Sequence, residues 1–351
     1  MPSPRPLRLA PACYHVLHLI PPMVAHEMNF FHEEGLTDDR GNDLYQFVTG
    51  GLAPFTFEKE TLQQAMKEQG ADVAMDVHPS TVAHTRLTES DRGLPKLVII
   101  AGWRNNNPNC LIAQPGINSL KDLVGKGIGC IDAKDNLVGA LSPVLKRNGI
   151  DPKKDVRWER GWAPQKATKG LRAGTLDSAF VPSIDVGPLE KDGFVNLFSI
   201  VEEYPNGRPD RIIVASQEAL DEQREGLKSF LKGMLRAYWF IRTMPENFQY
   251  LQNLEIRLRR QSFDPDEMRR PLVIGSAAHT EILPFPYDAR PTQLDAYLEE
   301  SVEMGELESA PPADSLTDFS VLDEAFAELS GRPDVKESLE RAKSVNERWG
   351  F

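Results

Sequence analysis

The chain has 351 residues, of which 40% are hydrophobic and 26% are charged, an ordinary balance for a globular protein with two lobes or domains. Its formal net charge of −12 argues against nucleic acid or an anionic membrane as a partner, although a locally basic cleft can still bind a small anion. The cysteines Cys13, Cys110 and Cys130 form no CxxC pair, and their odd number argues against a disulfide framework, so we expect a reducing compartment.

Short apolar runs alternate with amphipathic stretches over the first 200 residues, and the remainder is mostly helical in pattern. Strands are predicted at Leu7–Ala10, Tyr45–Thr49, Val73–Val77, Lys96–Trp103, Cys110–Gln114, Ile128–Ile131, Val156–Glu159, Asn196–Val201 and Arg211–Ser216. Helices are predicted at Leu19–Phe31, Phe57–Gln69, Thr81–Thr88, Leu137–Asn148, Pro164–Ala173, Gln217–Ile241, Pro245–Leu258, Pro265–Ile274, Thr292–Gly305, Leu316–Leu329 and Val335–Trp349. This order predicts an α/β protein with a helical C-terminal cover.

The N-terminal segment Met1–Pro22 superficially resembles a secretory signal, with two arginines before an apolar run. His15, His18, Pro11 and Pro21 interrupt that run, and no clean small-residue cleavage site follows it. We therefore expect a cytoplasmic protein, or a periplasmic or extracellular one if a leader is missing from the chain as written. The sequence contains no run of about 18 apolar residues, so we predict no membrane span.

Two stretches, Leu62–Ser80 and Gly170–Ser183, share one pattern: an amphipathic helix, a Gly turn, an Asp, a short apolar strand and a Pro-Ser exit. Asp72 and Asp177 occupy matching turn positions. Ligands of open parallel sheets bind beyond the carboxyl ends of the strands. The repeat therefore predicts two similar lobes that face one cleft, with the specificity in the residues just past each exit.

Several motifs resemble one family of binding proteins. They are INSLKDLVGKGIGCID at 117–132, NGIDPKKDVRW at 148–158, AHEMNFFHEEGL at 25–36 and the Gly170–Ser183 unit. Together, over roughly residues 7–245, they resemble the substrate-binding proteins of nitrate, sulfonate, taurine and thiamine-pyrimidine-precursor transport (SsuA/NMT1-like). That family also includes the yeast thiamine-pyrimidine synthases.

The resemblance implies a two-lobed type II periplasmic-binding fold with the ligand between the lobes. One lobe would comprise residues 1–104 together with 205–351, and the other would comprise residues 105–204. Two crossing segments would form the hinge, and closure of the lobes on the ligand is the expected motion.

Two departures from the family keep a second function open. The chain lacks a convincing secretion signal, and it lacks the cysteine-rich run of the yeast synthases. The fold also has cytoplasmic enzyme members, a dihydroxyphthalate decarboxylase and a sulfinate desulfinase. The alternative is therefore a cofactor-free decarboxylase or desulfinase that acts on an aromatic acid through His15, His78 and Cys13.

In the first lobe, candidate ligand contacts follow the first strand and the Val73–Val77 strand. Tyr14 and His15 lie in the loop after the first strand. The simpler interpretation of this loop is that it makes one or two contacts with the ligand. A metal site from Cys13, His15 and His18 is less favoured, because no acidic residue or distant histidine supports it. The remaining candidates, at the exit of the second of these strands, are Asp76, His78, Ser80 and Thr81.

The crossing segments and the second lobe supply the other candidates. They are Trp103, Arg104, Asp132, Asn136, Pro182, Ser183 and Arg211. Each arginine suits recognition of a carboxylate or sulfonate, and the indole suits stacking on a ring. The alternatives are a hinge salt bridge at Arg211, a buried tryptophan and helix capping by Asp135 or Asn136.

The predicted function is binding of a small polar organic ligand in the cleft, as an ABC-transporter-type substrate-binding protein. The expected ligand classes are anionic or aromatic carboxylates, sulfonates and pyrimidine-like compounds. We expect no cofactor and no metal, and we expect an ABC permease as a partner if the protein is secreted.

Overall fold

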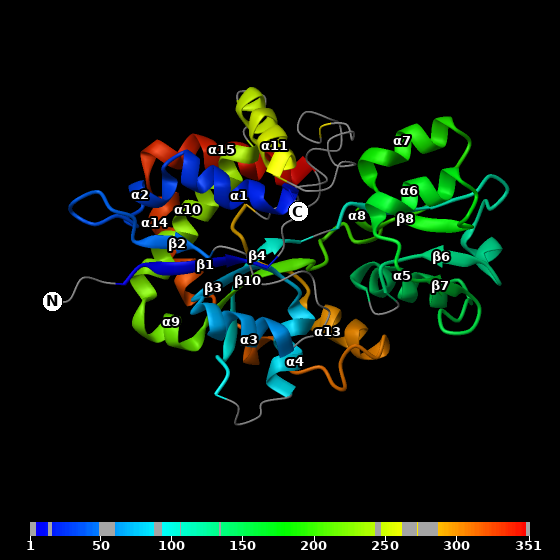
Figure 1. Ribbon diagram of the computed structural model, residues 1–351, viewed down its shortest axis with the longest axis horizontal. Coiled ribbons are helices and arrows are strands. Elements are labelled where there is room, and N and C mark those ends of the chain that lie inside the picture. The colour runs from blue at the N-terminus through cyan, green and yellow to red at the C-terminus, as the bar shows by residue number, and fades with distance from the viewer. Residues whose placement is uncertain are drawn as a thin grey trace.

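Two five-stranded sheets form the framework of the protein (Figure 1). The computed structural model describes residues 5–12, 16–48, 60–87, 93–105, 107–132, 135–242, 247–261, 272 and 287–348. Each sheet carries helices on its faces, which gives the two lobes of Figure 1 and confirms the predicted α/β, two-lobed class. Division of the chain at residues 104 and 205 stays a prediction.

The first sheet combines strands from the beginning and the middle of the chain. Its strands are β1 (Leu7–Pro11), β2 (Tyr45–Phe47), β3 (Val73–Val77), β4 (Leu97–Arg104) and β10 (Arg211–Ser216), in the order β2-β1-β3-β10-β4. The first three are parallel, whereas β10 is antiparallel to both of its neighbours. Every residue of β3, β4 and β10 is buried, as expected for strands covered by helices on both faces.

The second sheet is built from one continuous part of the chain. Its strands are β5 (Asn109–Ala113), β6 (Gly127–Gly129), β7 (Arg157–Glu159), β8 (Ser178–Pro182) and β9 (Val195–Ser199), in the order β7-β6-β8-β5-β9. Strand β6 runs parallel to β7 and β8, and β5 runs antiparallel to β8 and β9. The carboxyl ends of β6 and β8 therefore lie at the same edge, where α5 and α7 begin.

The helices divide between the two lobes in the same way as the strands. Around the second sheet lie α5 (Asn136–Arg147), α6 (Pro164–Arg172), α7 (Ser183–Lys191) and α8 (Ile200–Glu203). The first lobe holds α1 (Val16–Glu27), α2 (Phe30–Glu33), α3 (Glu60–Gln69), α4 (Pro79–Leu87), α9 (Gln217–Glu222), α10 (Arg224–Arg242), α11 (Phe248–Gln261), α13 (Leu294–Glu303), α14 (Ser320–Ser330) and α15 (Pro333–Arg348). Among the described residues, no helix is long and apolar enough to cross a membrane.

Helix α10 is the central helix of the larger lobe. It packs against α1, α2, α14 and α15, and its buried side chains belong to the largest apolar core. At Gly233 an added Cβ would lie 2.4 Å from the ring of Phe31, so the absence of a side chain there lets α2 pack closely.

The two matching aspartates of the repeated unit tie neighbouring strands together. Asp72 accepts a hydrogen bond from the main-chain N–H of Arg8 at 2.8 Å, and Asp177 accepts one from Gly127 at 2.8 Å. Both carboxylates thus satisfy main-chain donors of the adjacent strand, a structural use that agrees with their predicted place in turns.

Two of the predicted elements differ from the structure. Helix α1 begins at Val16 and contains Pro21 and Pro22 in its interior, although the sequence predicts a helix that enters through those prolines. Complete burial of Ile20 and Val24 in the core compensates for the main-chain hydrogen bonds that the prolines cannot donate. Strand β9 ends at Ser199, whose side chain caps α8, and the helix predicted at Pro265–Ile274 lies outside the described residues.

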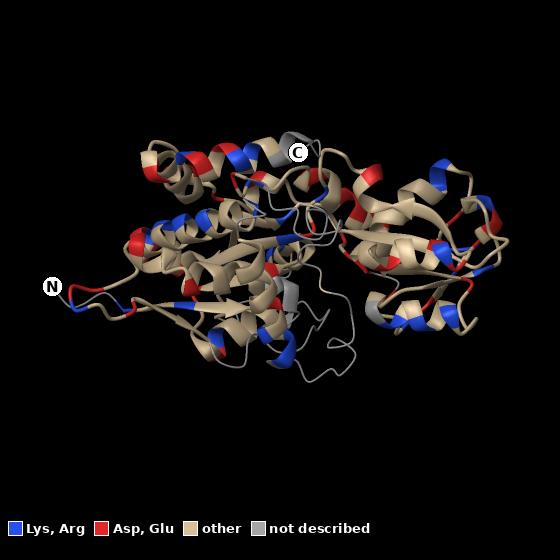
Figure 2. Cartoon of the chain, turned by 90° about the horizontal axis from the view of Figure 1, so that it is seen from above, with Lys and Arg blue, Asp and Glu red and all other residues tan. Residues whose placement is uncertain are grey.

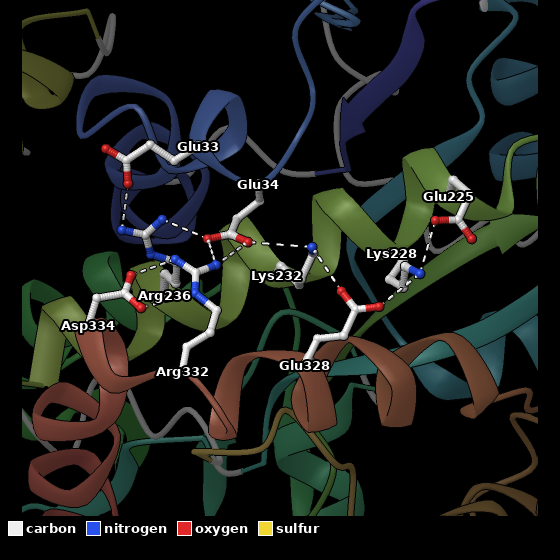
Figure 3. Close-up of polar contacts among 9 residues, drawn as sticks. All are labelled: Glu33, Glu34, Glu225, Lys228, Lys232, Arg236, Glu328, Arg332 and Asp334. Atoms are coloured by element: carbon white, nitrogen blue, oxygen red, sulfur yellow. Dashed lines mark hydrogen bonds and ion pairs between the residues drawn. The ribbon is translucent and has the colours of Figure 1, made fainter.

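A buried carboxylate joins the C-terminal helices to the rest of the larger lobe (Figure 3). The side chain of Glu34 is only 1% exposed and accepts hydrogen bonds from Arg332 at 2.7 and 2.8 Å and from Arg236 at 2.7 Å. Lys232 lies 3.5 Å from the same carboxylate and 3.0 Å from Glu328 on α14. One acidic group at the end of α2 therefore connects α10 with the turn between α14 and α15.

We predict that replacement of the Glu34 carboxylate lowers the stability of the protein. Glu34→Gln leaves Arg236, Arg332 and Lys232 facing an uncharged amide, and each of them keeps one other carboxylate partner, in Glu33, Asp334 and Glu328 respectively. Loss of a hydrogen bond to a charged group typically costs about 1.5–3 kcal/mol. We expect the free energy of unfolding in urea to fall by about that amount. The matched control is Glu337→Gln, which removes an exposed ion pair with Arg341 and should change stability by less than about 1 kcal/mol. Equal effects of the two substitutions would contradict the assignment.

Candidate functional site

The two chain segments that cross between the sheets lie against each other. The main-chain N–H of Arg208 donates to the carbonyl of Asn105 at 2.5 Å, and that of Asp210 donates to the carbonyl of Arg104 at 3.0 Å. Gly207 has a φ of 81°, and a Cβ there would lie 3.0 Å from the Asn105 carbonyl oxygen. Glycine is therefore required both for the left-handed backbone and for the close approach of the two segments.

Asp210 is the centre of the polar contacts at this crossing. Its side chain is 1% exposed and forms an ion pair with Arg104, whose Nε donates to Oδ2 at 2.6 Å. The other oxygen, Oδ1, accepts hydrogen bonds from the amides of Asn107 and Asn136 and lies 3.1 Å from Nη1 of Arg211. Because Asn136 begins α5, this single carboxylate connects the second lobe to β4 and β10 of the first.

A bulge in β3 turns Asp76 toward Arg211. Ile212 of β10 pairs with Val77 and Ile213 pairs with Met75, so Asp76 is the extra residue between them. It has a φ of 69°, a left-handed conformation that aspartate tolerates better than most residues. Its Oδ1 lies 3.3 Å from Nε of Arg211, and Nη1 of Arg211 is hydrogen-bonded to Nδ1 of His78 at 2.8 Å.

Arg208 links the crossing to both lobes. Its Nε donates to Glu300 of α13 at 2.8 Å, and its Nη1 donates to the side-chain oxygen of Asn136. The guanidinium also lies 4.8 Å from the ring centroid of Tyr297. At Gly139 of α5 a Cβ would be 3.1 Å from Nη2 of Arg208, so this helix leaves room for the arginine.

Helix α13 also contacts α5 directly, since Lys146 forms an ion pair with Glu303. We call the contacts among Asp76, His78, Arg104, Asn107, Asn136, Arg208, Asp210, Arg211 and Glu300 the interlobe network.

Burial and ion pairing fix the protonation states within the interlobe network. Burial alone would raise the pKa of Asp210, but the charges of Arg104 and Arg211 outweigh it and hold the pKa far below its ordinary value. Burial of the imidazole, together with the charge of Arg211, lowers the pKa of His78 well below its ordinary value. At neutral pH the network therefore contains an ionised Asp210 and a neutral His78.

Asp135 lies beside the network and behaves differently. Its Oδ1 caps α5 by accepting from the N–H of Leu137 at 3.1 Å, while its buried Oδ2 has no hydrogen-bond partner in the part of the chain that the structure describes. Burial raises the pKa of Asp135 to about 6, although the Leu137 N–H and the charge of Arg211 oppose the rise. Ionisation of the Asp135 carboxyl therefore costs more free energy in the folded protein than in water.

The structure assembles five of the residues proposed from sequence in one place, namely Asp76, His78, Arg104, Asn136 and Arg211.

Three more have other contacts: Ser80 donates to Glu306 at 2.6 Å, the N–H of Thr81 donates to the His78 carbonyl, and Asp132 lies 3.7 Å from Arg160. Trp103 is 1% exposed and packs edge-on against Tyr238 in the core, which matches the reading of a buried hinge tryptophan.

The second lobe contributes Pro182 and Ser183 at the junction of β8 and α7. Pro182 pairs with Asn109, and the N–H of Ser183 donates to the carbonyl of Pro108 on the first crossing segment at 2.9 Å. The hydroxyl oxygen of Ser183 is buried and lacks a hydrogen-bond partner within the described ranges. Cys13, Tyr14 and His15 lie outside the described residues.

Sequence reasoning does not select Arg208, Asp210, Glu300 or Asn107 as site residues. It names Asp135 as a candidate cap of the following helix, and the structure confirms that cap. The cluster Arg208-Pro209-Asp210-Arg211 was a usable signal, because three charged residues at a predicted crossing favour an ion-paired hinge. No local pattern marks Glu300, which lies far along the chain on α13. Among the described residues, no group of His, Cys, Asp and Glu could hold a metal ion.

The profile of the family described as NMT1/THI5 like matches residues 18–248, which is well over half of the chain. The chain belongs to this family. No curated protein matches this NMT1/THI5-like chain at the sequence level.

Solved structures of low sequence identity share its fold. The periplasmic nitrate-binding protein NrtA from Synechocystis PCC 6803 superposes with a TM-score of 0.65 at 12% identity, over 99% of each chain. The periplasmic aliphatic sulphonate binding protein SsuA from Escherichia coli gives 0.59 at 12% identity, over 90% of this chain and 92% of its own. The desulfurization enzyme DSZB gives 0.53 at 11% identity, over 92% and 99%. These likenesses establish the fold.

The raised pKa of Asp135 predicts a pH-dependent effect of Asp135→Asn in the NMT1/THI5-like protein. The asparagine keeps the helix cap but cannot ionise. The native state binds the Asp135 proton more tightly than the unfolded chain does, so the wild type loses stability relative to the variant as the pH rises from about 4 to about 7. A shift from 3.8 to about 6 corresponds to about 3 kcal/mol.

Urea unfolding of both proteins across this pH range measures the effect. Asp132→Asn, which changes a partly exposed carboxylate three residues away, serves as the control and should show no such trend. A difference between Asp135→Asn and wild type that stays constant with pH would contradict the prediction.

Proposed function

We propose that this NMT1/THI5-like protein binds a small polar organic molecule between its lobes, as a substrate-binding protein of the ABC-transporter type. The observation that carries the proposal is the interlobe network, in which Asp210 and Arg208 contact both lobes at the crossing. The network is polar and buried, and it connects the end of β3 with the start of α5, the helix that follows β6. Ligands of α/β proteins bind beyond these strand ends.

The ligand contacts that we propose are members of the network, together with Ser183 of the second lobe. His78 and Asp76 approach from the first lobe, Asn136 and Ser183 approach from the second, and Arg211 lies at the crossing. Asp76 has a backbone conformation that costs free energy, and such strain concentrates at functional sites. Neutral His78 can donate or accept a hydrogen bond without adding a charge. Trp103, packed in the core, is not among these contacts.

The proposed motion is hinge closure at the crossing. The two crossing segments are paired by main-chain hydrogen bonds on either side of Gly207, which leaves few residues to absorb a rotation. A polar boundary favours such movement, because water can solvate the separated groups more readily than it can solvate an apolar interface.

The proposed partner is an ABC permease that receives the ligand, and this proposal requires export of the protein. Support comes from NrtA and SsuA, which are periplasmic binding proteins. Fractionation of the native host, with detection of the protein in the periplasmic or extracellular fraction, supports the transport role. Recovery only with cytoplasmic markers would contradict export.

Ligand binding is tested by thermal unfolding of the full chain with alkanesulfonates, aromatic carboxylates, pyrimidines and small organic amines, alongside native mass spectrometry of the purified protein. We expect at least one class to raise the Tm. His78→Gln, which alters the group beside Arg211, should weaken that ligand by about 1.5 kcal/mol, or roughly tenfold. His32→Gln on α2, where the imidazole pairs with Asp43 at the surface, is the matched control and should bind normally.

Two outcomes would contradict the proposal. If no class raises the Tm and no small molecule is found in the purified protein, binding between the lobes is wrong. If an aromatic sulfinate or carboxylate is turned over, and turnover disappears in His78→Ala but persists in Lys336→Ala, the protein is an enzyme of the same fold.

A further inference from the structure

At the lobe boundary the carboxyl groups outnumber the guanidinium groups. Each of the three guanidinium groups of the interlobe network already faces a carboxylate: Arg104 pairs with Asp210, Arg211 with Asp76 and Asp210, and Arg208 with Glu300. His78, the remaining titratable member, is neutral at physiological pH. Within the described residues, no arginine of the network is left over to bind an anionic ligand.

Asp135 is a fourth carboxyl group at the same place. It lies immediately before Asn136, which hydrogen-bonds Asp210, and it is electrostatically coupled to both Asp210 and Arg211. Only 5% of the residue is exposed, and in the described part of the protein its Oδ2 has no hydrogen-bond donor. An unpaired carboxylate oxygen in a buried site carries a substantial desolvation penalty, which a donor would remove.

A second oxygen at this edge has the same need. The Ser183 hydroxyl begins α7 after β8, and Asp135 precedes α5 after β6; these two strands are parallel neighbours in the second sheet. Both oxygens are buried without a hydrogen-bond partner among the described residues. The carboxyl edge of the second sheet therefore presents an unpaired carboxylate oxygen, which accepts hydrogen bonds, and an unpaired hydroxyl, which can accept or donate one, whereas the arginines of the network are engaged.

We propose that Asp135 binds a positively charged nitrogen of the ligand, so that the molecule bound between the lobes is a small organic amine. This inference rests on the proposed function and fixes the charge of the group at the second lobe. The ammonium donates to Oδ2 of Asp135, while Oδ1 continues to cap α5. A cation at this position balances the fourth carboxylate, whereas a sulfonate or carboxylate would add a further negative charge.

The raised pKa of Asp135 agrees with this use of the carboxyl group. Burial raises its pKa to about 6, and the charge of Arg211 together with the main-chain N–H groups of Leu137 and Ile131 offsets the rise only in part. A bound cation stabilises the ionised form, so amine binding should release part of a proton near pH 6 and become weaker below it. The charged groups that act on Asp135 are Asp210, which raises its pKa, and Arg211, which lowers it.

Matched probes of opposite charge test the inference. Thermal unfolding of the full chain at neutral pH compares ethylamine with ethanesulfonate, and benzylamine with benzoate. We expect the amines to raise the Tm of the wild type and the anions to leave it unchanged. In Asp135→Asn the affinity for the amines should fall about tenfold or more, since a hydrogen bond to a charged group is lost. Asp132→Asn should retain the wild-type affinity.

The outcomes separate this inference from the proposed function. A rise in Tm with sulfonate or benzoate but not with the amines overturns the amine assignment and leaves binding between the lobes intact. Equal amine affinity in Asp135→Asn and the wild type also overturns it. Native mass spectrometry that finds a retained amine supports it, and a retained anion contradicts it. No response to any probe, with no retained molecule, overturns both.

Discussion

The buried, ionised carboxylate of Asp210 is the interaction on which the arrangement of the two lobes depends. It neutralises Arg104, accepts hydrogen bonds from the side-chain amides of Asn107 and Asn136, and lies against Arg211. Without it, buried guanidinium groups would face one another at the crossing, and the cost of unpaired charge would favour separation of the lobes. Asp210 has this role because its charged side chain lies on a segment that both lobes share.

A boundary built from charged groups differs from the apolar cores on either side of it. Each lobe has its own apolar clusters, and arginines, aspartates and asparagines connect the lobes at the crossing, while Met304 of the larger lobe also packs against the second lobe's cluster. Ion pairs between neighbouring elements recur elsewhere in the molecule, and acidic and basic residues are interspersed along the helices of both lobes (Figure 2). The acidic net charge is therefore spread widely, and the local balance at the crossing is set by a few side chains.

The sequence contained most of the fold but only part of the site. Runs such as Lys96–Trp103 predict buried strands because every residue after the lysine is apolar, and the Gly-Asp turns before β3 and β8 predict where strands begin. Asp76 and His78 could be selected because they lie near the exit of a predicted strand, and Arg211 because it lies at a predicted crossing. Glu300 could not, because pairing between distant segments is a property of packing, and the unsatisfied oxygen of Asp135 also depends on packing. Trp103 likewise required the structure, which places it in the core.

The position of β10 affects the order in which the protein can fold. Strands β5 to β9 come from residues 109–199 and can form their sheet as soon as that block leaves the ribosome. The first sheet must wait, because β10 lies between β3 and β4 and is made after the whole second lobe. Until residue 216 is synthesised, β3 and β4, which are fully buried in the folded protein, have unpaired edges that can join other chains. The lobe that begins the polypeptide is therefore the one that is completed last.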